Sequence, residues 1–324
     1  MISSHSRIFR KMLSTTPTSH FITLPNRPIV QPNGQIIRDN LKLHYWEWKG
    51  HLPTILFCHA ASFHARCYDR IINEALNGHH VISLDFRGHG RSQQHPPPYR
   101  FHWFGEDVLE FIEKSNIPKG NLIGIGHSVG GYALTYAAAK ASRQLFKSLL
   151  LLDPVIFFPE IYGNTFILDN FNVDYVLRRK SQYASVDEMF SRLENRPSFA
   201  NWPKDTLRSY CENALDENGK LVCSPEGEAS IYKTGAEAET NVFPLIEQSK
   251  FIQNIPVHIV RATVNDFSQL ESSPTNPELV QWFKKGRDVH LEDSKHLFPM
   301  VQPELSIDLV KQFINENNKL NSSL

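Results

Sequence analysis

The stretch Gly124-Ile-Gly-His-Ser-Val-Gly-Gly131 is the part of this sequence that says most about its fold. Residues 126–130 fit the pattern G-x-S-x-G, in which a serine stands on a sharp turn between a strand and a helix. The segment that precedes the serine, residues 121–126, is short and mostly apolar, as a buried strand would be. The residues that follow the serine have small side chains, which let a helix lie close to a sheet. A side chain two positions before or after Ser128 would collide across such a turn, which accounts for the glycines. The pattern predicts that the Ser128 hydroxyl stands above the end of a strand.

On both sides of this turn, short apolar runs alternate with helical patterns. Strands are expected at residues 41–48, 54–58, 80–85, 121–126, 148–153, 257–261 and 287–292. Helices are expected at residues 66–76, 100–115, 129–142 and 303–316. This alternation is typical of βαβ units. The sequence therefore predicts an α/β fold, with a mostly parallel sheet flanked by helices.

The alternation stops after Asp153. Residues 156–255 have a helical, aromatic-rich pattern without a clear buried strand, and the strand pattern then resumes at residue 257. An insertion of this size between two parallel strands is expected to form a helical cap over the sheet. We expect the remaining chain to divide into a flexible basic N-terminus (1–20), the α/β core (21–155 and 256–318) and a polar tail (319–324).

The base that would activate Ser128 is expected to be His296. A serine hydroxyl is a poor nucleophile without a base, and the base needs an orienting acid. In folds with this turn, the three residues follow in the order serine, acid, histidine. His258 and His290 fall within expected strands, whereas His296 follows the last strand. Ligands and catalytic groups collect at such carboxyl ends of strands.

Two aspartates compete for the role of the acid. Asp266 ends the loop that follows the expected strand 257–261, and it is the preferred candidate. Asp153 ends the expected strand 148–153 and is the alternative. Its neighbour Pro154 favours a simple turn at that position. The sequence thus predicts Ser128, Asp266 and His296 as the catalytic residues, with Asp153 as the rival acid.

The stretch Phe57-Cys-His-Ala-Ala-Ser-Phe-His64 is expected to contribute to an oxyanion hole. A tetrahedral intermediate needs backbone N–H groups aimed at its negative oxygen. We predict these donors to be Val129, directly after the serine, and Ala61 in this loop. His59 is expected to pin the loop through hydrogen bonds. The cysteines and histidines at 58–67 match no zinc spacing, so we predict neither a metal nor a cofactor.

Composition narrows the function classes. The 34 basic residues balance the 34 acidic ones, which argues against a nucleic-acid partner. No apolar run approaches a membrane span, no P-loop pattern is present, and nothing in the sequence indicates an oligomeric state. Residues 1–38 carry five basic residues and no acidic one, and their start resembles a mitochondrial transit peptide. The expected location is therefore cytoplasmic or mitochondrial.

Taken together, the motifs resemble the α/β-hydrolase superfamily. They are residues 57–60, Asp85-Phe-Arg-Gly-His-Gly-Arg-Ser92, residues 126–130, Asp266 and residues 294–299. In the cap, residues 195–199, Trp202, residues 221–226, Glu228 and Tyr232 resemble a poorly characterised branch of bacterial and fungal hydrolases. Most members have His-Gly where this chain has His59-Ala60. Because the nucleophile is a serine, similarity to epoxide hydrolases and haloalkane dehalogenases stops at the fold.

The resemblance implies a carboxylesterase- or lipase-like enzyme that cleaves an ester-like bond through an acyl-enzyme. Thioesterase, C–C hydrolase and perhydrolase chemistry on the same triad, or a non-catalytic ligand-binding protein, are the alternatives. The aromatic residues of the cap predict a small-molecule, apolar ester-like substrate. The basic run Arg178-Arg179-Lys180 is interpreted as a solvated helix face.

Overall fold

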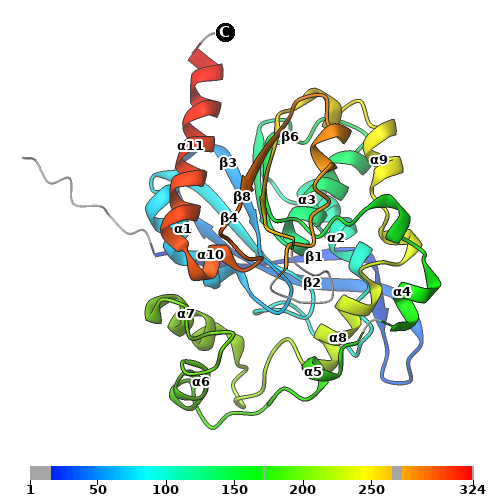
Figure 1. Ribbon diagram of the computed structural model, residues 1–324, viewed down its shortest axis with the longest axis vertical. Helices are drawn as coiled ribbons and strands as arrows, with labels where there is room; N and C mark the ends of the chain where they lie inside the picture. The colour runs from blue at the N-terminus through cyan, green and yellow to red at the C-terminus, as the bar shows by residue number, and fades with distance from the viewer. Residues whose placement is uncertain (1–15, 171, 265–271, 323–324) are drawn as a thin grey trace, which may run out of the picture.

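The computed structural model describes residues 16–170, 172–264 and 272–322 (Figure 1). Within these residues, eight strands form one sheet in the order β1-β2-β4-β3-β5-β6-β7-β8. The strands are β1 (Thr18–Val30), β2 (Ile36–Trp48), β3 (His51–Cys58), β4 (His79–Asp85), β5 (Leu122–His127), β6 (Phe146–Leu152), β7 (Val257–Ala262) and β8 (Gly286–Leu291). From β4 across to β8 all neighbouring strands are parallel, whereas β2 runs antiparallel to both β1 and β4. The predicted mostly parallel sheet is confirmed.

Helices cover both faces of this sheet. Figure 1 shows α1 (Asp69–Ala75) and α11 (Pro303–Ser322) on one side of it, and α2 (Phe101–Lys114), α3 (Val129–Lys140) and α9 (Phe243–Gln248) on the other. The central strand β5 is buried along its whole length. Ile123 and Ile125 pack into the core beneath α1 and α11, and Leu122 packs into the core beneath α2 and α3. A central strand covered on both faces explains why its sequence is almost continuously apolar.

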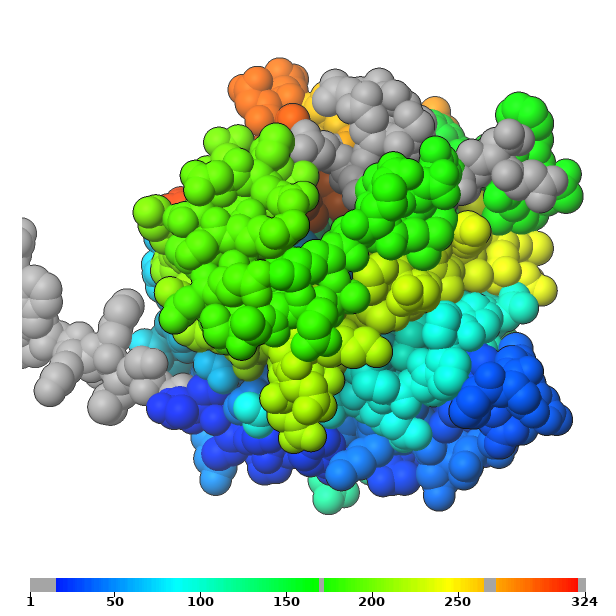
Figure 2. Space-filling view, turned by 90° about the horizontal axis from the view of Figure 1, so that it is seen from below, coloured from blue at the N-terminus to red at the C-terminus, as the bar shows by residue number. Residues whose placement is uncertain are grey.

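Residues 156–255, which the sequence predicts to form the cap, contain mainly short helices. They are α4 (Thr165–Asn170), α5 (Asp174–Leu177), α6 (Val186–Leu193), α7 (Lys204–Ala214), α8 (Pro225–Thr234) and α9. An isolated bridge between Gln182 and Lys220 ties the segment between α5 and α6 to the segment between α7 and α8. A second bridge, between Leu215 and Leu221, closes the segment between α7 and α8 on itself. Figure 2 shows the green and yellow atoms of the cap spread over one face of the molecule.

The strand β1 does not appear in the sequence expectations, and it changes the view of the N-terminus. It begins at Thr18, so the expected boundary at residue 20 falls inside a strand. Pro25 and Pro28 conceal it in the sequence, but proline is tolerated here because β1 is an edge strand paired only with β2. At the other end, α11 continues to Ser322, so the expected polar tail begins inside a helix.

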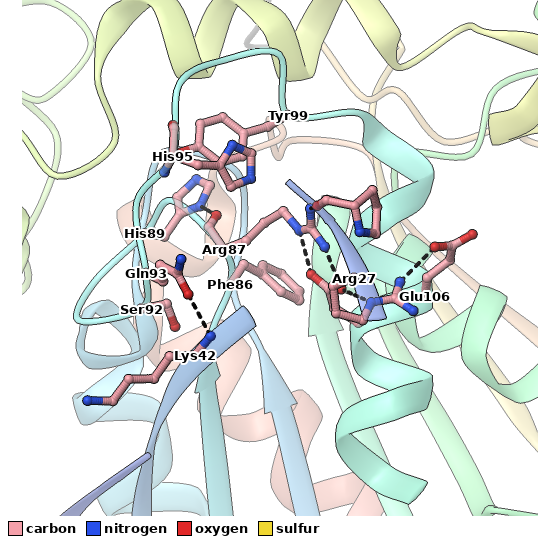
Figure 3. A network of polar contacts seen from close by, with 12 residues as sticks. Arg27, Lys42, Phe86, Arg87, His89, Ser92, Gln93, His95, Tyr99 and Glu106 are labelled. Carbon is pink, nitrogen blue, oxygen red and sulfur yellow. Dashed lines mark hydrogen bonds and ion pairs between the residues drawn. The ribbon is translucent and has the colours of Figure 1, made fainter. Parts of the chain in front are cut away.

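Two arginines fasten β1 to α2 and to the loop that follows β4. Arg27 of β1 donates to Asp107 (3.0 Å) and to Glu106 (2.6 Å). Arg87 donates to both oxygens of Asp107, at 2.6 and 2.7 Å, and to the Pro28 carbonyl at 2.6 Å. Figure 3 shows the guanidinium groups of Arg27 and Arg87 pointing toward each other from opposite sides. Arg27, one of the five basic residues of the predicted targeting segment, therefore has a structural role.

Residues 1–15 lie outside the described part of the chain, and the predicted cytoplasmic or mitochondrial location stays a prediction. No helix in the described ranges is long and apolar enough to cross a membrane.

Candidate active site

The serine turn has the geometry that its sequence predicts. Ser128 lies between β5 and α3 with φ at 57°, a conformation that is costly for a residue other than glycine. A Cβ atom on Gly126 would come within 2.5 Å of the Gly130 carbonyl oxygen. A Cβ atom on Gly130 would collide with the carbonyl of Cys58 at the end of β3. Both glycines are therefore needed for the turn to fit against the sheet.

Three side chains form a hydrogen-bonded line at this turn. The His296 ring reaches Ser128 Oγ with Nε2 at 3.0 Å and Asp153 Oδ2 with Nδ1 at 2.7 Å. Since a carboxylate can only accept, Nδ1 carries the hydrogen and Nε2 is free to accept from the serine hydroxyl. His296 lies in the loop between β8 and α10 (Phe298–Val301), as expected from its place after the last strand. This is the arrangement of a nucleophile, a base and an orienting acid.

The carboxylate that bonds the His296 ring in the structure is that of Asp153, the candidate ranked second from the sequence. The preferred candidate, Asp266, lies outside the described residues, but Asp153 already occupies the acceptor position on the His296 ring. The two aspartates follow β6 and β7, which are neighbouring parallel strands. Because β6 and β7 end at the same edge of the sheet, the order of residues along the chain does not distinguish the two candidates. The geometry supports Asp153 as the orienting acid, and the role of Asp266 stays a prediction because that residue lies outside the described part of the chain.

Asp153 is completely buried and held in one orientation. Its Oδ1 accepts hydrogen bonds from the Ala262 N–H (2.9 Å), the Ser273 hydroxyl (2.6 Å) and the Thr275 hydroxyl (3.1 Å). Burial alone would raise the pKa of this carboxyl, but the bond and charge of His296, with the Ser273 and Ala262 bonds, lower it below its ordinary value. The carboxyl is therefore ionised at neutral pH. Ser273 and Thr275 carry no recognisable motif, so the sequence did not single them out.

The predicted oxyanion donors stand next to this line. Val129 is the first residue of α3, where backbone N–H groups have no partner within the helix. Ala61 lines the same cavity as Ser128 and His296. Its neighbour Ala60 is not available, because the Ala60 N–H donates to the Tyr68 hydroxyl at 3.1 Å. The roles of Val129 and Ala61 stay predictions.

Two neutral histidines hold the loop that carries Ala61. His59 donates from Nδ1 to the Ala60 carbonyl (2.7 Å) and accepts the Phe86 N–H at Nε2 (3.0 Å). His89 accepts the Ser62 N–H at Nε2 (3.0 Å) and donates from Nδ1 to the Arg87 carbonyl (2.8 Å). Burial lowers the pKa of His59 to about 3 and that of His89 to about 4. The expected pinning role of His59 is confirmed, and the contribution of His89 was not foreseen.

A further chain of hydrogen bonds joins this loop to the backbone of His296. The Tyr68 hydroxyl accepts the Ala60 N–H and donates to His127 Nδ1 at 2.7 Å. His127 donates from Nε2 to the His296 carbonyl at 3.0 Å. Burial lowers the pKa of His127 to about 3, so the ring stays neutral and keeps these roles. No motif in the sequence singles out Tyr68, which lies in a short 3₁₀ turn before α1.

Above Ser128 and His296 lies a cavity of about 650 Å³. Its apolar lining residues include Phe101, Val155, Phe157, Met189, Leu193, Phe199, Trp202 and Leu297. Five basic residues also line it, namely Arg178, Arg179, Lys180, Arg192 and Arg196. The interpretation of residues 178–180 as a solvated helix face is incomplete, because these residues follow the end of α5 and line the cavity, although Arg178 is exposed. Elsewhere in the described ranges, no three His, Cys, Asp or Glu side chains are grouped as a metal ion would require.

A mostly parallel sheet with a serine turn after β5 and a histidine after β8 defines the α/β-hydrolase class. A family model described as "Alpha/beta hydrolase family" matches residues 55–309. The chain belongs to this family.

Individual relatives are more distant. Ethanol acetyltransferase 1 of Hanseniaspora uvarum is 27% identical over 201 residues, which are 58% of each chain. Esterase YbfF of Escherichia coli is 30% identical over 83 residues, 26% of this chain and 31% of its own. The chain thus spans less than two thirds of the length of these curated relatives. Among solved structures, E-2-(acetamidomethylene)succinate hydrolase has a TM-score of 0.66 at 22% identity, covering 91% of this chain and 100% of that one. This likeness shows the fold alone.

Proposed function

We propose that this protein is a serine hydrolase that cleaves a carboxylic ester-like bond of a small molecule through an acyl-enzyme. The observation that carries the proposal is the line of hydrogen bonds Ser128–His296–Asp153, which opens onto the cavity. Esterase activity in the name of a relative agrees with this reaction class.

In the proposed reaction, Ser128 Oγ attacks the substrate carbonyl while its proton moves to His296 Nε2. The Asp153 carboxylate holds the opposite ring nitrogen and stabilises the imidazolium that forms. The Val129 and Ala61 N–H groups bind the oxygen that becomes negative. The intermediate then expels the alcohol, which takes the proton from His296. Water, deprotonated by His296, cleaves the acyl-enzyme, so that acid and free Ser128 are produced.

An active-site-directed fluorophosphonate tests the nucleophile. We expect the wild-type protein to be labelled and to hydrolyse aryl acetates, and the Ser128→Ala variant to do neither. Ser191→Ala is the matched control, because Ser191 is an exposed serine of α6 outside the cavity. Labelling of Ser128→Ala at the wild-type level would contradict the assignment. Labelling of the wild type without turnover of any acyl ester would instead favour the ligand-binding alternative.

A second candidate function is acyl transfer to an alcohol. It is favoured by the likeness to an ethanol acetyltransferase over 58% of the chain. The same acyl-enzyme would form, and an alcohol would replace water in its cleavage. Incubation with an aryl acetate and ethanol separates the two functions, since a transferase yields ethyl acetate and a hydrolase yields acetate.

A further inference from the structure

The cationic side chains of the cavity come from neighbouring parts of the cap. Arg178, Arg179 and Lys180 directly follow α5, Arg192 lies in α6, and Arg196 lies just beyond the end of α6. Among the described lining residues, Glu228 of α8 is the one acidic side chain. The cavity that contains Ser128 therefore carries a strong excess of positive charge on its cap side.

Two of these cations have acidic partners. Arg179 forms an ion pair with Glu228 and also donates to the Tyr210 hydroxyl at 3.3 Å. Lys180 forms an ion pair with Glu188 of α6. Within the described residues, no ion pair joins Arg178, Arg192 or Arg196 to an acidic side chain. The positive charge of these three exposed arginines is available to a bound molecule.

The surroundings strengthen the attraction of these arginines for an anion. Leu193, Phe199 and Trp202 line the same cavity, and apolar walls focus the field of nearby charges. A guanidinium group is weakly hydrated and matches the geometry of a carboxylate or phosphate with two parallel hydrogen bonds. The lining of the cavity thus combines the serine turn, apolar side chains and the three exposed arginines Arg178, Arg192 and Arg196, which we call the cationic rim.

We propose that the substrate is an anionic acyl compound, with a carboxylate or phosphate group at the end remote from the scissile carbonyl. Arg178, Arg192 and Arg196 bind this group, while the apolar middle of the molecule lies against Leu193 and Trp202. This replaces the neutral, apolar substrate predicted from the aromatic content of the cap. The identity of the scissile bond rests on the proposed function, but the preference for an anion does not require turnover.

Binding to the Ser128→Ala variant tests the proposal without hydrolysis. The probes are 4-nitrophenyl glutarate with a free carboxylate, its methyl ester, and a 4-nitrophenyl ester of similar length that ends in a phosphate. We expect at least one anionic probe to bind about tenfold more tightly than the methyl ester at low ionic strength. The preference should shrink as salt is added, because the rim is open to solvent. Which of the two anionic probes binds more tightly shows whether the site prefers a carboxylate or a phosphate.

Charge-removing variants assign the preference to the rim. Arg192→Gln combined with Arg196→Gln should abolish most of it and leave the affinity for the methyl ester unchanged. The corresponding lysine substitutions keep the charge and should retain part of it. Lys233→Gln, on an exposed lysine of α8 outside the cavity lining, is the matched control and should keep all of it.

Three results would overturn the proposal: equal affinities for charged and neutral probes, no binding of either anionic probe, or an undiminished preference in the Arg192→Gln, Arg196→Gln variant. Thermal melting shows whether the variants are folded. Failure of the proposed function is a separate result, since it would appear as an absence of fluorophosphonate labelling in the wild type.

Discussion

The two carboxylate oxygens of Asp153 have different partners. Oδ2 bonds the His296 ring, and Oδ1 takes three hydrogen bonds from Ala262, Ser273 and Thr275. These bonds keep the carboxylate ionised and prevent it from rotating. They therefore fix both the tautomer and the direction of the His296 ring.

Replacing Asp153 by asparagine tests this role. The amide favours the wrong tautomer of His296, so we expect kcat to fall by about 10³–10⁴, the effect known from other triads. Asp266→Asn, which changes the candidate preferred from the sequence, is the matched control and should have little effect. Steady-state kinetics with an aryl acetate measures both variants. The opposite result, with Asp266→Asn inactive, would restore the original assignment.

At the scale of elements, loops from different strands are joined at the site by buried polar chains. The Tyr68 hydroxyl and His127 connect the loop after β3, through Ala60, to the loop after β8, through the His296 carbonyl. Tyr68 and His127 contact no substrate atom in the proposed mechanism. We expect them to be positioning residues that hold the loop of the Ala61 donor at the correct distance from His296.

The Tyr68→Phe variant removes the shared hydroxyl and leaves the ring. We expect kcat to fall roughly tenfold, less than the 10²–10³ lost when an oxyanion donor itself is removed, with KM little changed. Tyr45→Phe, on β2 and outside the cavity lining, is the control. A change in KM alone, or a loss of stability without a loss in kcat, would argue against a positioning role.

The link between β1 and α2 is expected to be essential for stability. Asp107 is completely buried between Arg27 and Arg87, so Asp107→Asn leaves the buried Arg87 without a charged partner and leaves Arg27 with Glu106 alone. We expect the free energy of unfolding to fall by about 3–5 kcal/mol. Glu106→Gln, which removes a partly exposed partner of Arg27, should cost less than about 1 kcal/mol. Urea denaturation measures both, and equal effects would contradict this account.

Some elements can be predicted from the sequence and others cannot. The expected strands and core helices were confirmed wherever an apolar run was continuous, because burial on both faces imposes that pattern. β1 was missed since an edge strand tolerates prolines and polar residues. The choice between Asp153 and Asp266 depended on the loops between two neighbouring strand ends, which no periodicity describes. The direction of Arg178 and Arg192 depends on how the cap packs, and this information is not local in the sequence.

For the whole molecule, buried neutral histidines make stability depend on pH. Burial lowers the pKa of His59 and His127 to about 3 and that of His89 and His95 to about 4. In the unfolded chain each ring would titrate near about 6.5. Above that pH both states are neutral, and stability is complete. As the pH falls from about 6.5 toward 4, these histidines bind protons in the unfolded chain but stay neutral in the folded protein, so the free energy of unfolding decreases.

We therefore expect the midpoint of thermal unfolding to decrease steadily between pH 7 and pH 5. The free energy of unfolding should fall by up to about 1.4 kcal/mol per pH unit for each of these histidines. His89→Gln should make the pH dependence shallower, whereas His290→Gln, on an exposed histidine of β8, should leave it unchanged. A midpoint independent of pH over this range would show that the rings are protonated in the folded state.

The cationic rim also bears on how a turnover would end. Under the proposed reaction, every cycle converts an uncharged acyl group into a carboxylate beside Ser128, so the departing acid carries one more negative charge than the substrate did. The arginines that attract the substrate would hold this acid still more strongly. Release of product, and not acylation, would then be the rate-limiting step at low ionic strength. The acid that accumulates would also inhibit the enzyme.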